Sequence, residues 1–433
     1  MEDKAIMRMD KDPSYFFKYQ RRFGKTSEPV ADLKVVKNGN EIIVTDSVEK
    51  ANILSDQYKS VWSDPMTSEI VYDLNEFFSG CTKCESQQTH ICINDLFLEE
   101  ISTKYLDQLV ELELEEKNHN ILTDADFSES HILKFINDIS VSSSTGPDGL
   151  PGKMIKEGKI VISKMLSIIG KQSIREGCFP TRLKNMFILG FHKGGKRDLA
   201  SQYRPIALTS HLAKILEKVV RISVINHLDL FNMMDPKQHG SRKGRSTLSQ
   251  LLIHQAEIID GLIEGNNVDN IYIDFSKAYD KVDHGVLLRK IKKLNIDGNL
   301  GKWIASFIRD RPQQVVVDGQ KSRKEIIRSG IPQGSVLGPI LFLIYIGDVC
   351  RKDGRALVYV DDVKLKGYIS NEDDVNQLQF ELDKLYEWGK ANNCIFNELK
   401  FMCLRYGKNR KLSDNTMYFT PEMNNIIEEV LEK

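Results

Sequence analysis

The sequence predicts an α+β protein in which helices pack behind an antiparallel sheet. From about Ala125 onward, helical patterns alternate densely with short apolar strands, and some of the strands pair as hairpins. The chain has 433 residues, 41% of them hydrophobic, and a formal net charge of −1. It is therefore long enough to bury a substantial core, and its overall charge gives no support to a nucleic-acid partner.

The part before Ala125 is polar and mixed, with an alternating apolar piece at EIIVT and a helical pattern over Ser47–Trp62. The turn-rich segment SSSTGPDGLPGKMI predicts a loop that opens a helix near Pro151, since proline suits the first helical position. The segment SHLAKILEKVVRI predicts a helix whose apolar face is formed by Leu212, Ile215, Leu216, Val219 and Val220.

The second half supplies the strands. NIYIDF predicts a strand that ends at Asp274, QQVVVDGQKSRKEIIRSG predicts a hairpin, and GPILFLIYIGDV predicts a buried helix. RALVYVDDVKLKG then reads as two short strands broken by Asp361 and Asp362, and a long helix follows from about Glu372 to Asn392. Mixed elements in this order underlie the α+β prediction.

The composition also bounds where the protein works. Seven scattered cysteines favour a reducing compartment over a disulfide framework. The first residues, MEDKAIMRMDKDPSYFF, lack the apolar core of a signal peptide, and the longest apolar run, PILFLIYI, is too short to span a bilayer. We therefore expect an intracellular protein, in the cytoplasm or nucleus, without a membrane partner.

The segment CTKCESQQTHIC raises the question of a zinc site. Its Cys81, Cys84, His90 and Cys92 supply the thiolate and imidazole ligands that zinc prefers. The C-x2-C half is a common spacing, but the H-x-C half is not. A surface loop without a metal therefore stays open as the alternative.

The adjacent aspartates Asp361 and Asp362 need an explanation, because two close carboxylates repel each other more strongly as water is removed. A solvated hairpin turn is the ordinary alternative, since aspartate is common in turns. Divalent cations reverse the repulsion, and a two-metal site needs at least three converging acids. Asp274, at the end of a neighbouring predicted strand, is the best third acid; its alternative role is to cap the next helix.

Six blocks, in order, resemble one known family. They are FHKGGKRDLASQYRPIALTSHLAKILEKVV, QHGSRKGRSTLSQLL, IYIDFSKAYDKVDH, SGIPQGSVLGPILF, LVYVDD and LYEWGKANNCIFNELKFMCLRYG. The sequence of these blocks resembles that of the reverse transcriptases of non-LTR (LINE-type) retrotransposons over roughly residues 140–407. The resemblance implies a right-hand polymerase palm and fingers. It divides the chain into an N-terminal connector (1–124), fingers and palm (125–407) and a truncated tail (408–433), with the primer grip and thumb missing.

The resemblance also implies a set of metal ligands. The side chains of Asp274, Asp361 and Asp362 and the main-chain carbonyl of Phe275 would bind two Mg²⁺ ions, with Mn²⁺ as a substitute. Tyr279 falls where the family has an aromatic ring that excludes a ribose 2′-hydroxyl, which implies a DNA product. Packing in the core is the alternative explanation for this tyrosine.

Further residues match the family's nucleotide contacts. Gln333 and Gly334 match a loop that packs against the nucleotide and the template base, and Arg204 matches a contact to the triphosphate. Lys193, or Lys196 across a flexible Gly-Gly pair, matches a second triphosphate contact. Lys400 matches a lysine proposed to protonate the departing pyrophosphate, and a solvated surface lysine is the alternative.

The implied function is an RNA-directed DNA polymerase of a retrotransposon. Its partners would be an RNA template, a DNA primer and dNTPs; the oligomeric state is not specified. A catalytically weak or inactive RNA-binding remnant of a retroelement is the runner-up, and a metal nuclease is disfavoured by Tyr279 and the PQG loop. The sequence departs from the family pattern at Ser241, where an aromatic is usual, and at Gly347, where asparagine is typical.

One basic stretch carries no motif. Leu288–Gly330 contains eleven Lys or Arg against four Asp or Glu, a net charge of 11 − 4 = +7. Such a stretch could follow a phosphate backbone, and an ordinary solvated helix face is the alternative.

Overall fold

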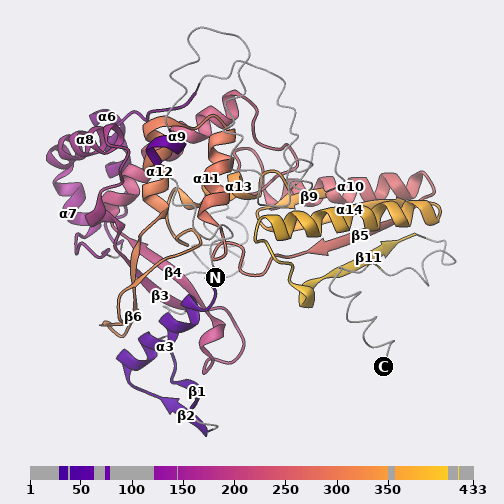
Figure 1. Cartoon of the computed structure of the whole chain (residues 1–433), viewed down its shortest axis with the longest axis horizontal. Helices are drawn as coiled ribbons and strands as arrows, with labels where there is room; N and C mark the ends of the chain where they lie inside the picture. The colour runs from indigo at the N-terminus through magenta and orange to yellow at the C-terminus, as the bar shows by residue number, and fades with distance from the viewer. Residues whose placement is uncertain are drawn as a thin grey trace, which may run out of the picture. The chain divides into compact units, whose positions relative to one another are not determined.

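A computed structural model of the chain describes residues 29–37, 40–62, 74–78, 121–143, 145–349, 356–407 and 418. The chain divides into two compact units. Unit 1 comprises Met1–Ser60, Phe187–Ile206 and Gln314–Glu325, and unit 2 comprises Val61–Met186, Ala207–Gln313 and Ile326–Lys433. Helices and sheets are mixed along the chain (Figure 1), which confirms the α+β prediction.

Unit 1 contains one helix and several short strands. β1 (Leu33–Lys37) and β2 (Asn40–Val44) pair antiparallel, and α3 (Ser47–Lys59) follows, with Asp46 as its N-cap. The predicted helix is therefore confirmed, although it ends three residues before Trp62.

A second sheet, which draws mainly on unit 1, has the strand order β4-β3-β6-β7, and β8 also pairs with β6. Its strands are β3 (Met186–His192), β4 (Tyr203–Thr209, after the 3-10 turn η3, Ala200–Gln202), β6 (Pro312–Val317), β7 (Gln320–Lys321) and β8 (Glu325–Ile326). The predicted hairpin is β6–β7, whose two-residue turn, Asp318 and Gly319, has φ of 48° and 80°. Aspartate followed by glycine is a residue pair that is common in two-residue hairpin turns with positive φ at both positions.

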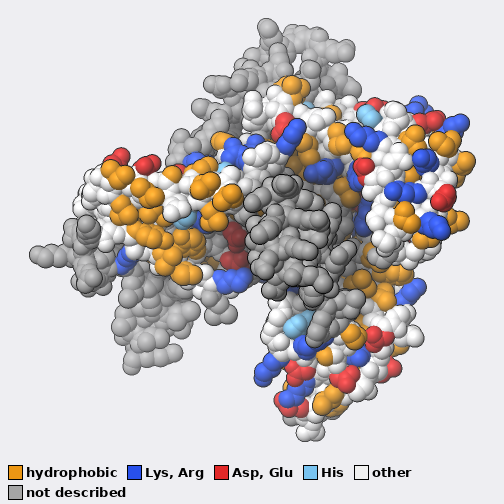
Figure 2. Space-filling model, turned by 180° about the vertical axis from the view of Figure 1, so that it is seen from behind, with side chains coloured by type: hydrophobic (Ala, Val, Ile, Leu, Met, Phe, Trp, Pro, Cys, Tyr) orange, Lys and Arg blue, Asp and Glu red, His pale blue; other side chains and the backbone are white. Residues whose placement is uncertain are grey.

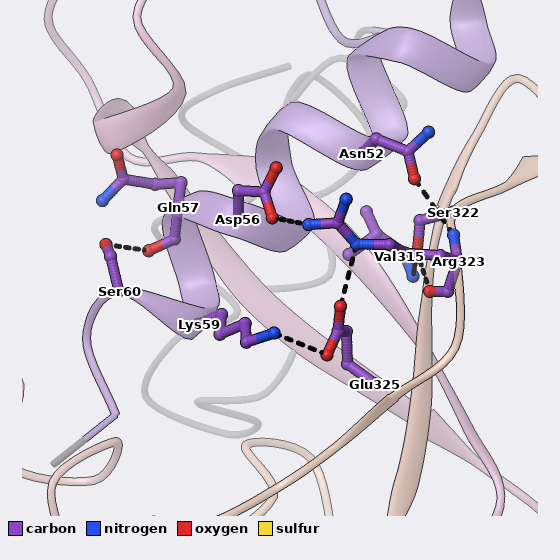
Figure 3. Close-up of polar contacts among 9 residues, drawn as sticks. All are labelled: Asn52, Asp56, Gln57, Lys59, Ser60, Val315, Ser322, Arg323 and Glu325. Atoms are coloured by element: carbon purple, nitrogen blue, oxygen red, sulfur yellow. Dashed lines mark hydrogen bonds and ion pairs between the residues drawn. The ribbon is translucent and has the colours of Figure 1, made fainter. Parts of the chain in front are cut away.

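Ion pairs join α3 to the segment after β7 (Figure 3). The Arg323 guanidinium binds the carboxylate of Asp56 and donates from Nε to Glu325 at 2.8 Å, while Lys59 donates to Glu325 at 2.9 Å. The hydrogen bond from Lys59 lowers the pKa of the Glu325 carboxyl. Most of these side chains are exposed, so the network orients α3 more than it stabilises unit 1.

Unit 2 contains most of the helices. They are α4 (Leu74–Phe77), α6 (Glu129–Asn137), α7 (Gly152–Glu157), α8 (Lys159–Arg175), η2 (Thr181–Lys184), α9 (His211–Leu230), α10 (Thr247–Ile263), α11 (His284–Lys293), α12 (Gly298–Ile308), α13 (Gly338–Ile346), α14 (Glu372–Ala391) and η4 (Glu398–Lys400). Pro151 is the N-cap of α7, one residue before the position expected from the sequence. The predicted apolar face of α9 is confirmed, since four of its five residues are buried and Leu212 packs against the core.

The sheet of unit 2 has the strand order β11-β5-β10-β9, and all three strand pairs are antiparallel. Its strands are β5 (Asn267–Ile273), β9 (Ala356–Tyr359), β10 (Asp362–Ile369) and β11 (Met402–Tyr406). The predicted strand at NIYIDF and the predicted hairpin around the two aspartates are therefore both confirmed.

α14 packs on one face of this sheet and α10 contacts the other; Figure 1 labels both helices beside β5. Val363, Leu365 and Ile369 alternate along β10 and are buried, and Gly367 lies so close to α14 that a Cβ would come within 2.7 Å of a Leu378 methyl. The other side of β10 meets α10, where Lys366 pairs with Glu257 at 2.9 Å. The alternation of the strand thus separates an apolar contact with α14 from a polar contact with α10.

α10 places polar residues against the sheet and apolar residues outside. Gln250 and His254 are buried, and His254 Nε2 hydrogen-bonds the Tyr272 hydroxyl at 2.9 Å. Leu248 and Ile263 on the same helix are 63% and 77% exposed. Figure 2 shows hydrophobic side chains gathered on the side of unit 2 that carries α10. Hydrogen bonds therefore hold this helix on the sheet together with the burial of Ile258 and the close packing of Gly261 against Tyr368 and Val268.

α13 is the predicted buried helix. All of its residues except Pro339 are buried, and Gly347 follows as its C-cap. Within the described part of the chain, no helix combines the length and apolar character needed to cross a membrane.

The contact between α14 and the sheet gives a stability prediction. Leu378 and Leu382 are both 0% exposed, so Leu378→Ala or Leu382→Ala should lower the free energy of unfolding by about 2–5 kcal/mol through lost burial and a cavity. Phe380→Ala on the same helix, where the ring is 52% exposed, is the matched control and should change little. Urea unfolding followed by circular dichroism measures both, and equal effects at the three positions would contradict this packing.

Candidate active site

The pairing of β5 with β10 brings the sequence-predicted acids to one end of one sheet. Val363 lies opposite Ile273, so the same register, extended by one residue, sets Asp362 opposite Asp274. Residues directly opposite in an antiparallel pair have their Cα atoms roughly 4.5–5.5 Å apart. Asp274, predicted to come from a neighbouring strand, is therefore beside the aspartate pair.

Asp361 lies in the turn that joins β9 to β10. Tyr359 pairs with Asp362, so Val360 and Asp361 form the two-residue connection. Val360 has a φ of 58°, in the left-handed region that a β-branched residue rarely adopts. Such a conformation costs on the order of 1–3 kcal/mol and persists only where surrounding contacts impose it.

The three carboxyl groups influence one another electrostatically. Burial raises the pKa of Asp361, and the nearby charges of Asp362 and Asp274 raise it further. The pKa of Asp362 is raised by burial and then by Asp274. A site that disfavours the charged forms of Asp361 and Asp362 in this way attracts cations.

A lysine neutralises the third acid. Lys400 Nζ lies 2.9 Å from Asp274 Oδ2, and Asn397 donates to the same oxygen at 3.2 Å. Lys400 is exposed and nevertheless ion-paired, which argues against a merely solvated lysine. The alternative role of Asp274 as a helix cap is not what the structure contains, because the next helix, α11, is capped by Asp283.

The predicted carbonyl ligand, Phe275, is held by a short bridge to Phe396. The hydrogen bonds of this bridge run from Asn397 N to Asp274 O at 2.8 Å and from Ser276 N to Ile395 O at 2.8 Å. They leave the carbonyl of Phe275 out of the pairing. The donor set of carboxylates and one carbonyl is made of hard oxygen atoms, which fits Mg²⁺. Among the described residues, however, no three His, Cys, Asp or Glu side chains are grouped tightly enough to hold an ion as they stand.

Tyr279 lies close to these acids. Its ring stacks on Phe342 of α13, with centroids 4.1 Å apart and planes 15° from parallel. Burial and the charge of Asp361 raise the pKa of its hydroxyl to about 12. The ring is thus packed on one side, as the core alternative requires, while it also lies near the candidate metal ligands.

Gln333 and Gly334 form a tight connection before α13. Gln333 Nε2 donates to Asp280 Oδ1 at 2.9 Å, and its main-chain oxygen accepts from Ala207 N at 2.6 Å. Gly334 has a φ of 117°, and a Cβ there would lie 2.6 Å from the Ala207 carbonyl oxygen. Glycine is therefore required at this position for both conformation and space.

The remaining predicted contacts are not brought into this cluster by any described interaction. Lys193 and Arg204 belong to unit 1 and are exposed; Lys193 begins the turn between β3 and β4, where Gly194 and Gly195 have positive φ. Their nucleotide-binding roles stay predictions. The candidate zinc ligands, Cys81, Cys84, His90 and Cys92, lie outside the described residues.

The basic stretch after Leu288 is not a uniform solvated face. Arg311 is fully buried, donates to the Phe307 carbonyl at 2.9 Å and has a pKa lowered to about 10 by burial. Lys290 pairs with Asp348 at 2.6 Å. Arg311 and Lys290, which the sequence analysis counted in a stretch that could follow a phosphate backbone, thus make contacts inside unit 2 instead.

Sequence reasoning missed two buried residues that support the site. Gln238 hydrogen-bonds the main chain of Val360, and Glu217 Oε2 accepts from Val336 N at 2.6 Å and Leu337 N at 3.0 Å. Both residues are within blocks that resemble the family. Nothing in their spacing indicates these contacts, because the partners are more than a hundred residues away.

Comparisons with known proteins identify the family of the chain. Residues 192–412, just over half of the chain, match the family described as reverse transcriptase (RNA-dependent DNA polymerase). The chain is 30% identical over 271 residues to the probable RNA-directed DNA polymerase from transposon BS of Drosophila melanogaster, covering 60% of this chain and 30% of that protein.

Two further relatives agree. The RNA-directed DNA polymerase from mobile element jockey of Drosophila melanogaster is 28% identical over 62% of this chain and 30% of its own length. A Pol polyprotein from a type-1 retrotransposable element R2 of Popillia japonica is 26% identical over 46% of this chain and 27% of its own length. The chain thus spans less than a third of each of these relatives. It belongs to the reverse transcriptase (RNA-dependent DNA polymerase) family, of the non-LTR (LINE-type) retrotransposon kind.

Proposed function

We propose that this chain carries RNA-directed DNA polymerase activity, joining dNTPs to a primer 3′-hydroxyl on an RNA template. The observation that carries the proposal is the register that sets Asp362 opposite Asp274, with Asp361 in the adjoining turn. In this proposal the sheet of unit 2 is the palm, and the β4-β3-β6-β7 sheet belongs to the fingers. The names of the relatives support the reaction, which belongs to longer proteins.

Asp274, Asp361, Asp362 and the Phe275 carbonyl would hold two divalent cations. Bound there, the cations would activate the attacking hydroxyl and stabilise the departing pyrophosphate. The raised pKa values of Asp361 and Asp362 support this assignment, because a cation relieves the repulsion that raises them. Lys400 would leave Asp274 as the cations enter and would then lie free to protonate the pyrophosphate.

The other site residues would bind and orient the nucleotide. Tyr279, held by its stack on Phe342, would present a rigid edge that collides with a ribose 2′-hydroxyl. Gln333, tethered by Asp280, would pack against the incoming base, with Gly334 allowing close approach of the main chain. Arg204 and Lys193 would bind the triphosphate.

The central test is primer extension on an RNA template with dNTPs and Mg²⁺. Asp361→Ala/Asp362→Ala should lower the rate by on the order of a thousandfold or more, because carboxylate ligands are lost. Glu372→Ala/Asp373→Ala, which removes two adjacent exposed acids from α14, is the matched control and should retain activity. Folded chain that binds RNA but extends no primer would contradict the proposal and favour a binding remnant.

Sugar selectivity tests Tyr279. Tyr279→Ala should raise the ratio of rNTP to dNTP incorporation on the order of 10- to 200-fold, the range that one added or missing group in a pocket usually produces. Tyr279→Phe keeps the ring and its stack on Phe342 and should retain the selectivity. Single-nucleotide insertion kinetics with paired dNTP and rNTP substrates measure the ratio; unchanged selectivity in Tyr279→Ala would assign the ring to core packing alone.

A further inference from the structure

The turn that carries Asp361 is held by one buried side chain. Gln238 is 2% exposed, and its Oε1 accepts from Val360 N at 2.9 Å while its Nε2 donates to Val360 O at 3.3 Å. The amide therefore meets both main-chain groups of one residue. A neighbouring β-strand makes the same pair of bonds to a residue opposite it.

The segment around Gln238 is fastened to the strand before the turn. His239 N donates to Val358 O at 3.0 Å, and Val358 N donates to Lys237 O at 3.2 Å. Gly240 N also donates to Gln238 Oε1, at 2.7 Å, which fixes the orientation of the amide. A Cβ on Gly240 would lie 2.6 Å from Val360 N, so the main chain of the segment lies directly against the turn.

These contacts explain how Val360 keeps a φ of 58°. A β-branched residue leaves the left-handed region unless other groups hold it there. The Gln238 amide binds both the N–H and the C=O of Val360 as they lie in that conformation, and the glycine at 240 leaves room for the contact. A buried glutamine that merely filled space would leave polar groups to be satisfied elsewhere, whereas both ends of this amide are used on the turn.

We propose that Gln238 is a positioning residue: its amide holds the Val360 peptide in the left-handed conformation and so sets where the carboxylates of Asp361 and Asp362 point. The inference rests on the proposed polymerase function for the role of those carboxylates. Gln238 touches neither the acids nor the nucleotide in this scheme, and it acts only through the main chain of Val360.

The test is a double-mutant cycle between Gln238 and Val360. Gln238→Met removes the hydrogen bonds but keeps the side-chain volume. Val360→Gly lets residue 360 adopt a positive φ without the hydrogen bonds from Gln238. Gln238→Ala is a second variant that tests the same cycle if Gln238→Met does not fold. Gln313→Met is the matched control: Gln313 is also buried, at 5% exposed, and lies in β6, a strand of the other sheet.

Two quantities are measured for each folded variant: Mn²⁺ affinity, by electron paramagnetic resonance without nucleotide, and the rate of primer extension. Gln238→Met should weaken Mn²⁺ binding about tenfold and slow extension roughly 10- to 100-fold, since a misplacement of about 1 Å can cost a hundredfold. In the Val360→Gly background the same change should cost less than about threefold in both quantities. Val360→Gly alone and Gln313→Met should stay near the parent values.

Two outcomes would overturn the positioning role of Gln238. One is Mn²⁺ affinity in Gln238→Met equal to that of the parent, and the other is an equal loss with and without Val360→Gly, which would mean a general structural role. Failure of the proposed function looks different: a parent chain that binds Mn²⁺ through Asp361 and Asp362 but extends no primer. In that case, recovery of Mn²⁺ binding when Val360→Gly is added to Gln238→Met would still support the positioning role of Gln238.

Discussion

The antiparallel pairing of β5 with β10 is the interaction on which the candidate site depends. Its register runs unbroken from Ile369 opposite Asn267 to Val363 opposite Ile273, and the two acids follow at the open end. Because side chains alternate along a strand, a slip of one residue would send the apolar set that meets α14 to the polar side of the sheet. The register that packs β10 against α14 is therefore the same register that places the acids.

The site gathers negative charge that the fold compensates only in part. Burial and mutual repulsion raise the pKa values of Asp361 and Asp362, and the positive charge of Lys400, which is ion-paired with Asp274, opposes that rise only in part. A flexible lysine is a replaceable counter-charge, since it can leave when cations arrive. Among the described residues, no group of three metal-binding side chains is preformed.

Polar side chains from distant segments, buried or partly buried, hold each loop of the site. Gln238 holds the turn at Val360, Asp280 orients the amide of Gln333, and Glu217 accepts two main-chain N–H groups at the start of α13. Burial raises the pKa of Glu217, and the charge of Arg311 opposes that shift. Such contacts are costly to leave unmade, so each loop is confined to one conformation.

The sequence by itself determined the element types and the family, because hydrophobic period, turn residues and ordered motifs are local properties. The strand before Asp274, the buried helix α13 and the start of α14 at Glu372 all follow from such patterns. Only the tertiary structure decided that α10 turns its polar side to the sheet, that Lys400 pairs with Asp274 and that Gln238 holds Val360. These contacts join residues more than a hundred positions apart, and a pattern with a period of two to four residues carries no record of them.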